Sequence, residues 1–539
     1  MDLLPSAHVD TFCRDHLPAA DEWPELSFDL PELSYPERLN CATALLDDVI
    51  ARMGGDQHGG SRPCLHAPGA DTWSYDDLLA AANRIAHVLV DDLGIVPGNR
   101  VLLRGPNNQW LTACWFAVLK AGAVAVTTMP LLRPGELATI HEIARIDLAL
   151  VDERFLSGTE GLSGELGVRV VPFGGSSGLA ELTAGKPTSY DDVATSSDDV
   201  ALLAFTSGTT GRPKATMHFH RDVLAICDTF SRHVLRPSPD DVFTGTPPYG
   251  FTFGLGGVLL FPLHAGASTV LVEKATPPEL AGIIEQFGVT TCFTAPTAYK
   301  AMLAAGATLP SLRAAVSAGE HLPAATWEAF REATGVRIID GIGATELLHI
   351  FISAAGDDIR PGSTGRAVPG YTATVLDEEG GEAAPGQPGR LAVKGPTGCR
   401  YLSDPRQRAY VRDGWNITGD TFSRDEDGYF WYHARSDDMI ISAGYNIAAP
   451  EVEEALLKHP DVAECAVVGV PDEARGSIVK AYVVLTDPAL ASPDKVLELQ
   501  DFAKAEIAPY KYPRALEFVA ELPRTATGKL QRFRLREDN

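Results

Sequence analysis

The sequence lacks any closely spaced pair of cysteines. Its eight cysteines are scattered along the chain and form no CxxC pattern. Their spacing therefore gives no support to a zinc site, a thiol redox pair or a disulfide framework. Isolated thiols of this kind are typical of a protein that works in the reducing cytoplasm.

The sequence also has no long apolar run and no excess of positive charge. No stretch approaches the roughly 20 apolar residues of a membrane-spanning helix, and the start, MDLLPSAHVDTF, lacks the features of a secretion signal. Lysine and arginine total 45 against 71 acidic residues, a net charge of −26. Such a charge argues against binding to nucleic acid or to an anionic membrane. We therefore expect a cytoplasmic protein with neither partner.

What the chain does contain is an alternation of helix-like and strand-like segments. Its 539 residues exceed one ordinary core, so at least two domains are expected. From about residue 72, amphipathic helices, such as the one predicted from Tyr75 to about Val90 with Ser74 as its cap, alternate with short apolar strands such as 100–104. This alternation predicts an α/β fold in which helices cover both faces of a mainly parallel sheet.

The pattern changes after about residue 360. Turn pairs such as Pro385-Gly386 separate short strand-like runs, which predicts a β-subdomain at about 360–434. A charged turn at 435–438 precedes a compact α+β unit of about 100 residues, which is within the normal size of a domain. We therefore predict a large N-terminal domain over 1–434, a hinge at 435–438 and a small, mobile C-terminal domain over 439–539.

The segment Thr206–Lys214, TSGTTGRPK, follows the buried-strand pattern of residues 200–205. Gly208 and Gly211 tolerate unusual backbone angles, so backbone N–H groups can face inward, and the hydroxyls and the lysine add donors for anionic oxygens. A triphosphate is the ligand that suits such a loop. The segment is not the common P-loop, which needs GxxxxGK[ST]. Taken alone, it also fits a flexible surface turn.

Polar, glycine-containing turns end two other predicted strands, at Ser317 and at Asp340. In parallel sheets, ligands bind beyond the carboxyl ends of the strands. The three turns therefore indicate a binding site at this edge of the fold.

Four further motifs follow the loop in a fixed order: GIGATE at Gly341–Glu346, Trp415 with Thr418–Asp420, Arg435–Asp438, and Pro523–Lys529. Together with TSGTTGRPK, they resemble the signature of the adenylate-forming superfamily, the acyl-CoA synthetases and other AMP-binding enzymes. The resemblance covers nearly the whole chain. The N-terminal wording SAHVDTF and LPAADEWPEL, and the segment Leu347–Phe351, resemble the 2-aminobenzoate and benzoate CoA ligases in particular.

The resemblance implies a nucleotide site that needs ATP and Mg²⁺. It assigns the β- and γ-phosphates to the loop and Lys214, the metal to Glu346 and Thr206, and the ribose to Asp420 and Arg435. Thr206, Lys214, Glu346 and Lys529 are the implied catalytic residues. The full implied set of ATP and AMP ligands comprises Thr206, Ser207, Gly208, Thr209, Thr210, Lys214, Gly319, Glu320, Asp340, Gly341, Thr345, Glu346, Asp420, Arg435 and Lys529.

Lys529 lies near the C-terminus, where the basic segment RFRLRED that follows it also fits a disordered tail. The resemblance implies that this lysine enters the cleft during adenylation and binds the carboxylate and α-phosphate oxygens. The small domain must then move, which gives Asp437 the role of a hinge residue. After that movement, Gly444 would line the route of the CoA thiol and Arg475 would contact the CoA nucleotide.

The predicted acid pocket comprises Tyr249, Gly250, Phe251, Ala318, Gly319, Ile342 and His349. Tyr249 and Phe251 would flank a flat ring. His349 would meet a polar ring substituent, or else it is a core histidine bonded to a backbone carbonyl. Ile342 stands where many relatives carry an aromatic residue that stacks on adenine, so it shapes the acid pocket instead. No aspartate lies in 247–257 to balance the amino group of an α-amino acid, which disfavours an amino-acid-loading domain.

The sequence therefore predicts an AMP-forming ligase that joins an aryl acid, preferably an aminobenzoate or hydroxybenzoate, to CoA. Two alternatives keep the adenylation step: transfer to a carrier-protein thiol, or adenylation of nitrite followed by diazotisation of an amino-aryl acid. A non-catalytic nucleotide sensor would show damaged motifs, whereas Lys214, Glu346, Asp420 and Lys529 are intact. The acid, the pathway and the oligomeric state, including a homodimer, stay open.

Overall fold

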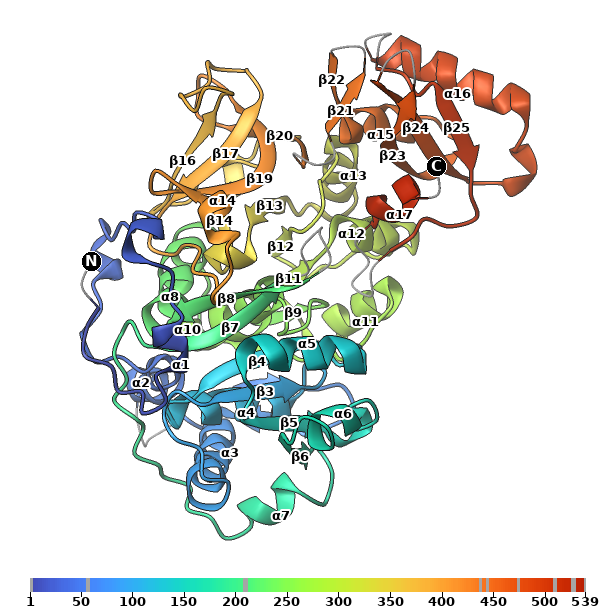
Figure 1. The fold of residues 1–539 in the computed structure, drawn as a ribbon. Coiled ribbons are helices and arrows are strands. Elements are labelled where there is room, and N and C mark those ends of the chain that lie inside the picture. Colours follow the sequence, from blue (N-terminus) through green and yellow to red (C-terminus); the bar gives the residue numbers. More distant parts are fainter. Residues whose placement is uncertain are drawn as a thin grey trace.

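The structure is a computed structural model that describes residues 3–54, 59–206, 212–435, 439–442, 445–472, 476–507, 511–524 and 530–537. Figure 1 shows the chain in colour from the N-terminus to the C-terminus, with the last residues gathered in a small unit at one end of the molecule. The predicted α/β fold is confirmed: mainly parallel sheets form the large part of the chain, and a smaller α+β part follows.

The first of the two large sheets has six strands. Strands β3 to β7 run parallel, and β8 turns back beside β7. In spatial order the strands are β6 (Arg169–Phe173), β5 (Leu148–Asp152), β3 (Arg100–Arg104), β4 (Val124–Thr128), β7 (Val200–Thr206) and β8 (Lys214–Phe219). The predicted phosphate loop therefore connects two neighbouring strands as a hairpin, with Thr206 directly opposite Lys214.

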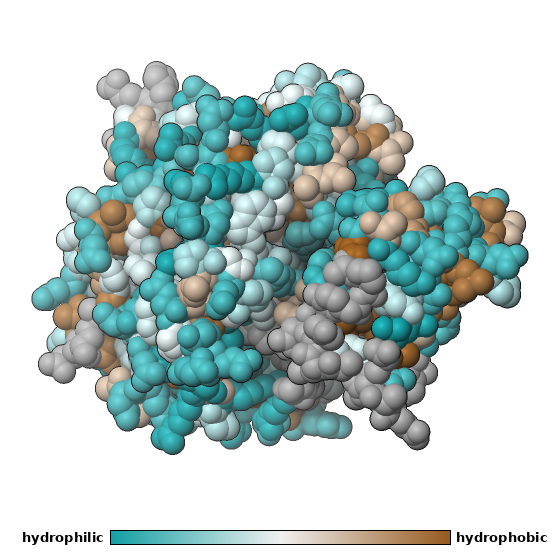
Figure 2. All heavy atoms as spheres, turned by 90° about the horizontal axis from the view of Figure 1, so that it is seen from above, coloured by the Kyte–Doolittle hydropathy of each residue, from teal (hydrophilic) through white to brown (hydrophobic). Residues whose placement is uncertain are grey.

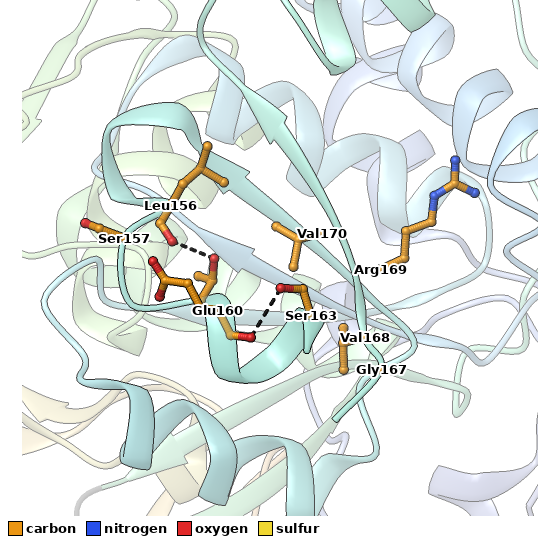
Figure 3. A pocket seen from close by; sticks show the side chains of 9 residues that line it. Leu156, Ser157, Glu160, Ser163, Gly167, Val168, Arg169 and Val170 are labelled. Atoms are coloured by element: carbon orange, nitrogen blue, oxygen red, sulfur yellow. Dashed lines mark hydrogen bonds between the residues drawn. The ribbon is translucent and has the colours of Figure 1, made fainter. Parts of the chain in front are cut away.

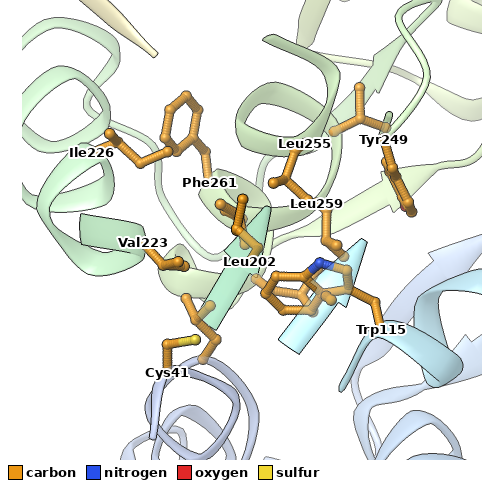
Figure 4. Close-up of a cluster of buried hydrophobic side chains, with 14 of the residues drawn as sticks. Cys41, Trp115, Leu202, Val223, Ile226, Tyr249, Leu255, Leu259 and Phe261 are labelled. Atoms are coloured by element: carbon orange, nitrogen blue, oxygen red, sulfur yellow. The ribbon is translucent and has the colours of Figure 1, made fainter. Parts of the chain in front are cut away.

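Helices cover both faces of this sheet, as the alternating pattern predicted. Val101 and Leu103 of β3 belong to a buried cluster with residues of helices α3 and α4, whereas Leu102 points into a second cluster with Leu137 and Ile140 of α5. Figure 4 shows part of the first cluster, where Leu202 of β7 lies among side chains from α4, α8 and α10. Strands buried on both faces explain the nearly continuous apolar runs in the sequence.

The second large sheet has nine strands, of which β1 and β9 to β13 run parallel. In spatial order they are β15 (Arg366–Ala367), β14 (Ile350–Ser353), β13 (Ile338–Gly343), β12 (Ala314–Ser317), β11 (Thr291–Thr294), β9 (Val242–Gly245), β10 (Ser268–Val270), β1 (Pro63–His66) and β2 (Trp73–Ser74). Ser317 and Asp340 face each other across β12 and β13, so two of the predicted polar turns share one sheet edge.

Three antiparallel or mixed sheets make up the rest. The predicted β-subdomain holds β16 (Thr372–Leu376), β17 (Gly389–Lys394), β18 (Val411–Arg412), β19 (Trp415–Arg424) and β20 (Phe430–Arg435). The C-terminal part holds the pair β21 (Met439–Ser442) and β22 (Tyr445–Ala448), and the sheet β23 (Val462–Asp472), β24 (Gly476–Leu485) and β25 (Ala515–Phe518).

The α-helices begin and end where capping and turn residues allow. Helix α3 starts with a capping box, in which the Ser74 side chain accepts the Asp77 N–H and the Asp77 side chain accepts the Ser74 N–H. The helices are α1 (Phe12–Asp15), α2 (Asp48–Arg52), α3 (Tyr75–His87), α4 (Gln109–Lys120), α5 (Pro134–Ala144), α6 (Glu160–Ser163), α7 (Leu179–Thr183), α8 (His220–Ile226), α9 (Thr252–Gly254), α10 (Phe261–Ala265), α11 (Pro277–Phe287), α12 (Pro296–Ala304), α13 (Ala324–Thr334), α14 (Gln407–Tyr410), α15 (Ala449–Leu457), α16 (Pro493–Glu506) and α17 (Arg532–Glu537).

The glycine-rich stretch 247–257 forms regular structure over its second half. From Thr252 it is helical, through α9 and the π-helical turn Leu255–Leu260 into α10. Glycine is a poor helix former, but neighbouring rings leave no room for a side chain at two of these positions. A Cβ on Gly256 would lie 2.3 Å from the His349 ring, and one on Gly257 would lie 2.3 Å from the Phe293 ring.

The surface agrees with the acidic composition. Figure 2 shows that the face seen from above is largely hydrophilic, with hydrophobic side chains scattered over it. Among the described helices, none is long and apolar enough to cross a lipid bilayer.

Candidate active site

A lysine, a tyrosine and a glutamate meet at the end of β7 and β8 that adjoins the predicted phosphate loop. Lys214 Nζ lies 2.5 Å from Tyr401 Oη and 3.4 Å from Glu346 Oε1, and the Tyr401 hydroxyl lies 2.5 Å from the same carboxylate oxygen. Tyr401 is fully buried and Glu346 is 7% exposed. Three distant parts of the chain therefore form one polar cluster at the predicted phosphate site.

Tyr401 was not predicted from the sequence. Residues 400–402 lie along β8 like an extra strand, since the Met217 N–H donates to the Arg400 carbonyl over 2.8 Å and the Leu402 N–H donates to the Ala215 carbonyl over 2.9 Å. Burial, reinforced by the Glu346 carboxylate, raises the pKa of the Tyr401 phenol, so its hydroxyl keeps its proton. In the sequence, Tyr401 is one of 14 tyrosines without a distinguishing motif.

Glu346 lies on the short 3₁₀ helix Thr345–Leu347, which follows β13. His218, fully buried on β8, contacts the Thr345 carbonyl with its Nε2 at 2.8 Å. The strand that begins with Lys214 therefore also holds the turn that carries Glu346. This arrangement brings the predicted phosphate lysine and the predicted metal carboxylate together.

The residues at this point fit a magnesium ion. Both side-chain contacts to Glu346 fall on Oε1, and within the described part of the chain Oε2 accepts no hydrogen bond. Mg²⁺ prefers carboxylate and hydroxyl oxygens and keeps several waters. The second predicted ligand, Thr206, ends β7 directly opposite Lys214.

The predicted adenosine ligands come from two different sheets. Gly319 follows β12 with φ of +88°, a left-handed conformation that favours glycine. Asp420, 7% exposed, lies on β19 directly opposite Arg435 of β20. The backbones of these two predicted ribose ligands are therefore cross-strand neighbours, and their role toward the ribose stays a prediction.

Asp340 is half-buried at the end of the parallel part of β13. Burial raises the pKa of its carboxyl from 3.8 to about 8, and this effect outweighs the hydrogen bond that the Gly341 N–H donates. A carboxyl whose pKa is higher in the folded state stabilises the fold below its unfolded pKa, and this contribution is lost as the pH rises through the folded value.

We therefore expect wild-type protein to lose stability relative to Asp340→Asn as the pH rises from about 4 to about 8. Urea unfolding of both proteins at pH 5 and pH 8, chosen to span this range, would measure the difference. Parallel pH profiles would show that Asp340 titrates like an exposed carboxyl. The comparison with the amide variant removes the contribution of the other acidic residues.

The C-terminal part contacts the large part of the chain at Glu320, one of the predicted ATP ligands. Arg524 Nη1 lies 3.6 Å from Glu320 Oε1, and Arg524 Nη2 lies 2.8 Å from Glu464 on β23. Arg524 also forms a β-bridge with Leu530. Arg524 is thereby held close to the loop 318–320, and Leu530 lies beside Arg524. Residues 525–529, which include Lys529, lie outside the described part of the chain.

His349 lies at the centre of a cage of phenylalanines. Its ring centroid is 4.6 Å from that of Phe261, 5.4 Å from Phe230, 5.8 Å from Phe253 and 6.4 Å from Phe293. Burial lowers the pKa of the imidazole to about 3, so the ring is neutral. Within the described residues, neither ring nitrogen makes a hydrogen bond of normal geometry. A contact with the Phe253 backbone nevertheless raises the pKa of the imidazole against the larger effect of burial, so both predicted roles of His349 stay predictions.

The other predicted pocket residues differ in their contacts and in their burial. The Tyr249 hydroxyl lies 3.2 Å from the Thr112 hydroxyl on α4, and the Tyr249 backbone N–H donates to Asn107 Oδ1. Tyr249 and Ala318 are buried, whereas Phe251 and Ile342 are half-buried. Gly250 lies against the backbone at Thr128 and Met129, where a Cβ would be 3.1 Å away.

Several predicted residues lie outside the described part of the chain. They are Ser207, Gly208, Thr209 and Thr210 of the phosphate loop, the hinge residue Asp437, the CoA residues Gly444 and Arg475, and Lys529. For Arg435, only the backbone position is described. The roles of all these residues stay predictions.

A surface hollow of about 630 Å³ contains none of the predicted residues (Figure 3). It lies against β6, at the opposite edge of the six-stranded sheet from the β7–β8 hairpin. Its lining comprises Leu156, Ser157, Thr159, Glu160, Ser163, Gly167, Val168, Arg169 and Val170. This hollow is separate from the Lys214 cluster.

Comparison with known proteins agrees with this geometry. The family model of the AMP-binding enzymes matches residues 54–401, and that of the AMP-binding enzyme C-terminal domain matches residues 451–529. The benzoate–CoA ligase of Thauera aromatica is 34% identical over 94% of this chain and 97% of its own length. The 3-hydroxybenzoate–CoA ligase of Aromatoleum sp. (strain CIB) is also 34% identical, over 93% of this chain and 97% of its own.

Solved structures extend the comparison to the fold. The anthranilate CoA ligase AuaEII in complex with anthranoyl-AMP superposes with a TM-score of 0.88 at 35% identity, covering 94% of this chain and 99% of its own. A benzoate CoA ligase from Burkholderia xenovorans LB400 gives a TM-score of 0.83 at 30% identity, covering 92% and 100%. The resemblance inferred from the motifs is thus confirmed, and the chain belongs to the AMP-binding enzyme family.

Proposed function

We propose that this protein activates an aryl carboxylic acid with ATP as an acyl-AMP and transfers the acyl group to CoA. The observation that carries the proposal is the cluster of Lys214, Tyr401 and Glu346 at the loop end of β7 and β8. This cluster places a cation and a buried carboxylate beside a loop suited to a triphosphate. Relatives named as benzoate, hydroxybenzoate and anthranilate CoA ligases support an aryl acid as the substrate.

In the first half-reaction, a carboxylate oxygen of the acid attacks the α-phosphorus of ATP, and the bond to pyrophosphate breaks. In this proposal the Lys214 ammonium holds the anionic phosphates, and Glu346, 3.4 Å from it, would offer a carboxylate oxygen to Mg²⁺. When bound, Mg²⁺ neutralises negative charge on the phosphates. In the second half-reaction the CoA thiol attacks the acyl carbon, and AMP leaves.

The acid pocket that we propose places one neutral imidazole among phenylalanine rings. The phenylalanines around His349 suit a flat aromatic ring. An imidazole with a pKa of about 3 offers one donor and one acceptor at neutral pH, and no charge. It therefore suits an amino or hydroxyl substituent and gives no counter-charge to a second carboxylate. This supports aminobenzoate or hydroxybenzoate over a dicarboxylic acid.

Replacing His349 with phenylalanine tests this assignment. We expect the ratio of kcat/KM for 2-aminobenzoate to that for benzoate to fall by about tenfold, because a buried hydrogen bond to the substituent is lost. Since the imidazole is neutral across the working range, the wild-type ratio should not change between pH 6 and pH 9. An equal loss for both acids would assign His349 to packing alone.

A screen of pyrophosphate release tests the function as a whole. Each aryl acid is offered with ATP, alone, with CoA, with nitrite and with a carrier protein. The proposal expects release that depends on an aryl acid, and a thioester product only with CoA. Release that requires nitrite, or thioester formation only on the carrier protein, would overturn the choice of acceptor while leaving adenylation intact.

A further inference from the structure

The Tyr401 hydroxyl has both of its hydrogen-bonding roles occupied. It accepts from the Lys214 ammonium at 2.5 Å and donates to Glu346 Oε1 at 2.5 Å. A phenol has one proton to give, an ammonium can only donate, and an ionised carboxylate can only accept, so the direction of both bonds is fixed. The hydroxyl therefore sets where the lysine and the carboxylate lie relative to each other.

The surroundings make these bonds strong. Tyr401 is fully buried, and the side chains of Lys214 and Glu346 are 16% and 9% exposed. Charge-assisted hydrogen bonds are shorter and stronger than neutral ones, and low local dielectric strengthens them further. The Lys214 ammonium also lies 4.4 Å from the centre of the Tyr401 ring, so the ring and the hydroxyl make separate contributions.

The backbone holds Tyr401 firmly in this position. The Tyr401 backbone forms an antiparallel β-bridge with Thr216 of β8. The Tyr401 N–H donates to Gln407 Oε1 over 2.9 Å, while Gln407 Nε2 donates to the carbonyls of Cys399 and Glu22 over 3.0 Å and 2.9 Å. A buried amide with three partners leaves the tyrosine little freedom. The phenol is thus a fixed point, whereas the longer lysine side chain can turn.

We propose that Tyr401 is the positioning residue of the metal site, holding Glu346 through Oε1 so that Oε2 faces Mg²⁺·ATP. The proposal rests on the proposed nucleotide site. Oε1 takes both side-chain contacts, and within the described residues Oε2 takes no hydrogen bond. When phosphates arrive, Lys214 turns to them, and the Tyr401–Glu346 bond remains to fix the carboxylate. Tyr401 itself does not touch the reacting atoms.

The test is Tyr401→Phe, which removes one oxygen and keeps the ring. ATP binding is measured by calorimetry with Mg²⁺ and with EDTA, without acid or CoA, so that the identity of the acid has no influence. We expect the affinity gained from Mg²⁺ to fall by about tenfold, the effect of one hydrogen bond to a charged group. Affinity in EDTA should change by less than about twofold, because the lysine still reaches the phosphates.

Tyr410→Phe is the matched control. The Tyr410 ring lies 5.8 Å from both the Lys214 ammonium and the Tyr401 ring, but its hydroxyl has no part in the proposed positioning. This variant should keep the full Mg²⁺ effect. An equal loss in both variants would indicate general loosening of the site and would overturn the proposal.

A second variant keeps the test decisive if Tyr401→Phe is less stable. In a Glu346→Gln background, Tyr401→Phe should change the Mg²⁺ effect by less than about twofold, because residues that act through one another are not additive. Additive losses, or loss of ATP affinity to the same extent in Mg²⁺ and in EDTA, would contradict a role toward the metal. Failure of every variant and of wild type to bind ATP would instead refute the proposed function.

Discussion

Replacing Lys529 with alanine should slow formation of the acyl-adenylate by on the order of a hundredfold, comparable to the loss of one strong transition-state donor. The resemblance places this lysine on the carboxylate and α-phosphate oxygens. Arg524 and Leu530 flank the segment that carries Lys529, and a β-bridge joins them. Arg524 also contacts Glu320, one of the predicted ATP ligands. A cation delivered there would stabilise negative charge that develops at the α-phosphorus.

The thioester half-reaction separates this role from general damage. Starting from chemically prepared aryl-AMP, Lys529→Ala should transfer the acyl group to CoA at nearly the wild-type rate, because the resemblance implies that the small domain moves before the thiol attacks. Lys504→Ala is a suitable control, since Lys504 lies in the same part of the chain on α16 and pairs with the exposed Asp501. Equal loss in both half-reactions would contradict the assigned role.

Replacing Asp222 with alanine should destabilise the protein by about 3–5 kcal/mol. Asp222 and Arg400 form an ion pair in which both side chains are fully buried. The Arg400 guanidinium also lies 4.0 Å from the centre of the Phe219 ring. Removal of the carboxylate leaves a buried cation without its counter-charge, which costs far more than the net contribution of the intact pair.

Chemical denaturation of the variant would measure this loss. Asp357→Ala is the matched control, because Asp357 is 99% exposed and its partner Arg337 is 43% exposed, so the change should stay below about 1 kcal/mol. Similar small losses in both variants would show that the Arg400 charge finds other compensation. Because Arg400 precedes Tyr401, the Asp222 variant should also disturb the nucleotide site.

The large sheets could be predicted because their signal is local. Apolar periodicity and capping residues a few positions away predict strands such as Arg100–Arg104 and helices such as α3. Strand β8 depends on its partners instead. Pairing with β7 and with residues 400–402 holds Lys214–Phe219 extended, and strand formation depends strongly on such tertiary context.

The α/β class and the family could be read from the sequence alone, because hydrophobic periodicity and motifs with a fixed order and spacing carry that information along the chain. The tertiary structure was needed to show that Tyr401 joins Lys214 and Glu346, which lie 187 and 55 positions away from it, and that His349 lies among four phenylalanines. Hydrogen bonding and burial depend on which strands lie side by side. No pattern within a single segment records that.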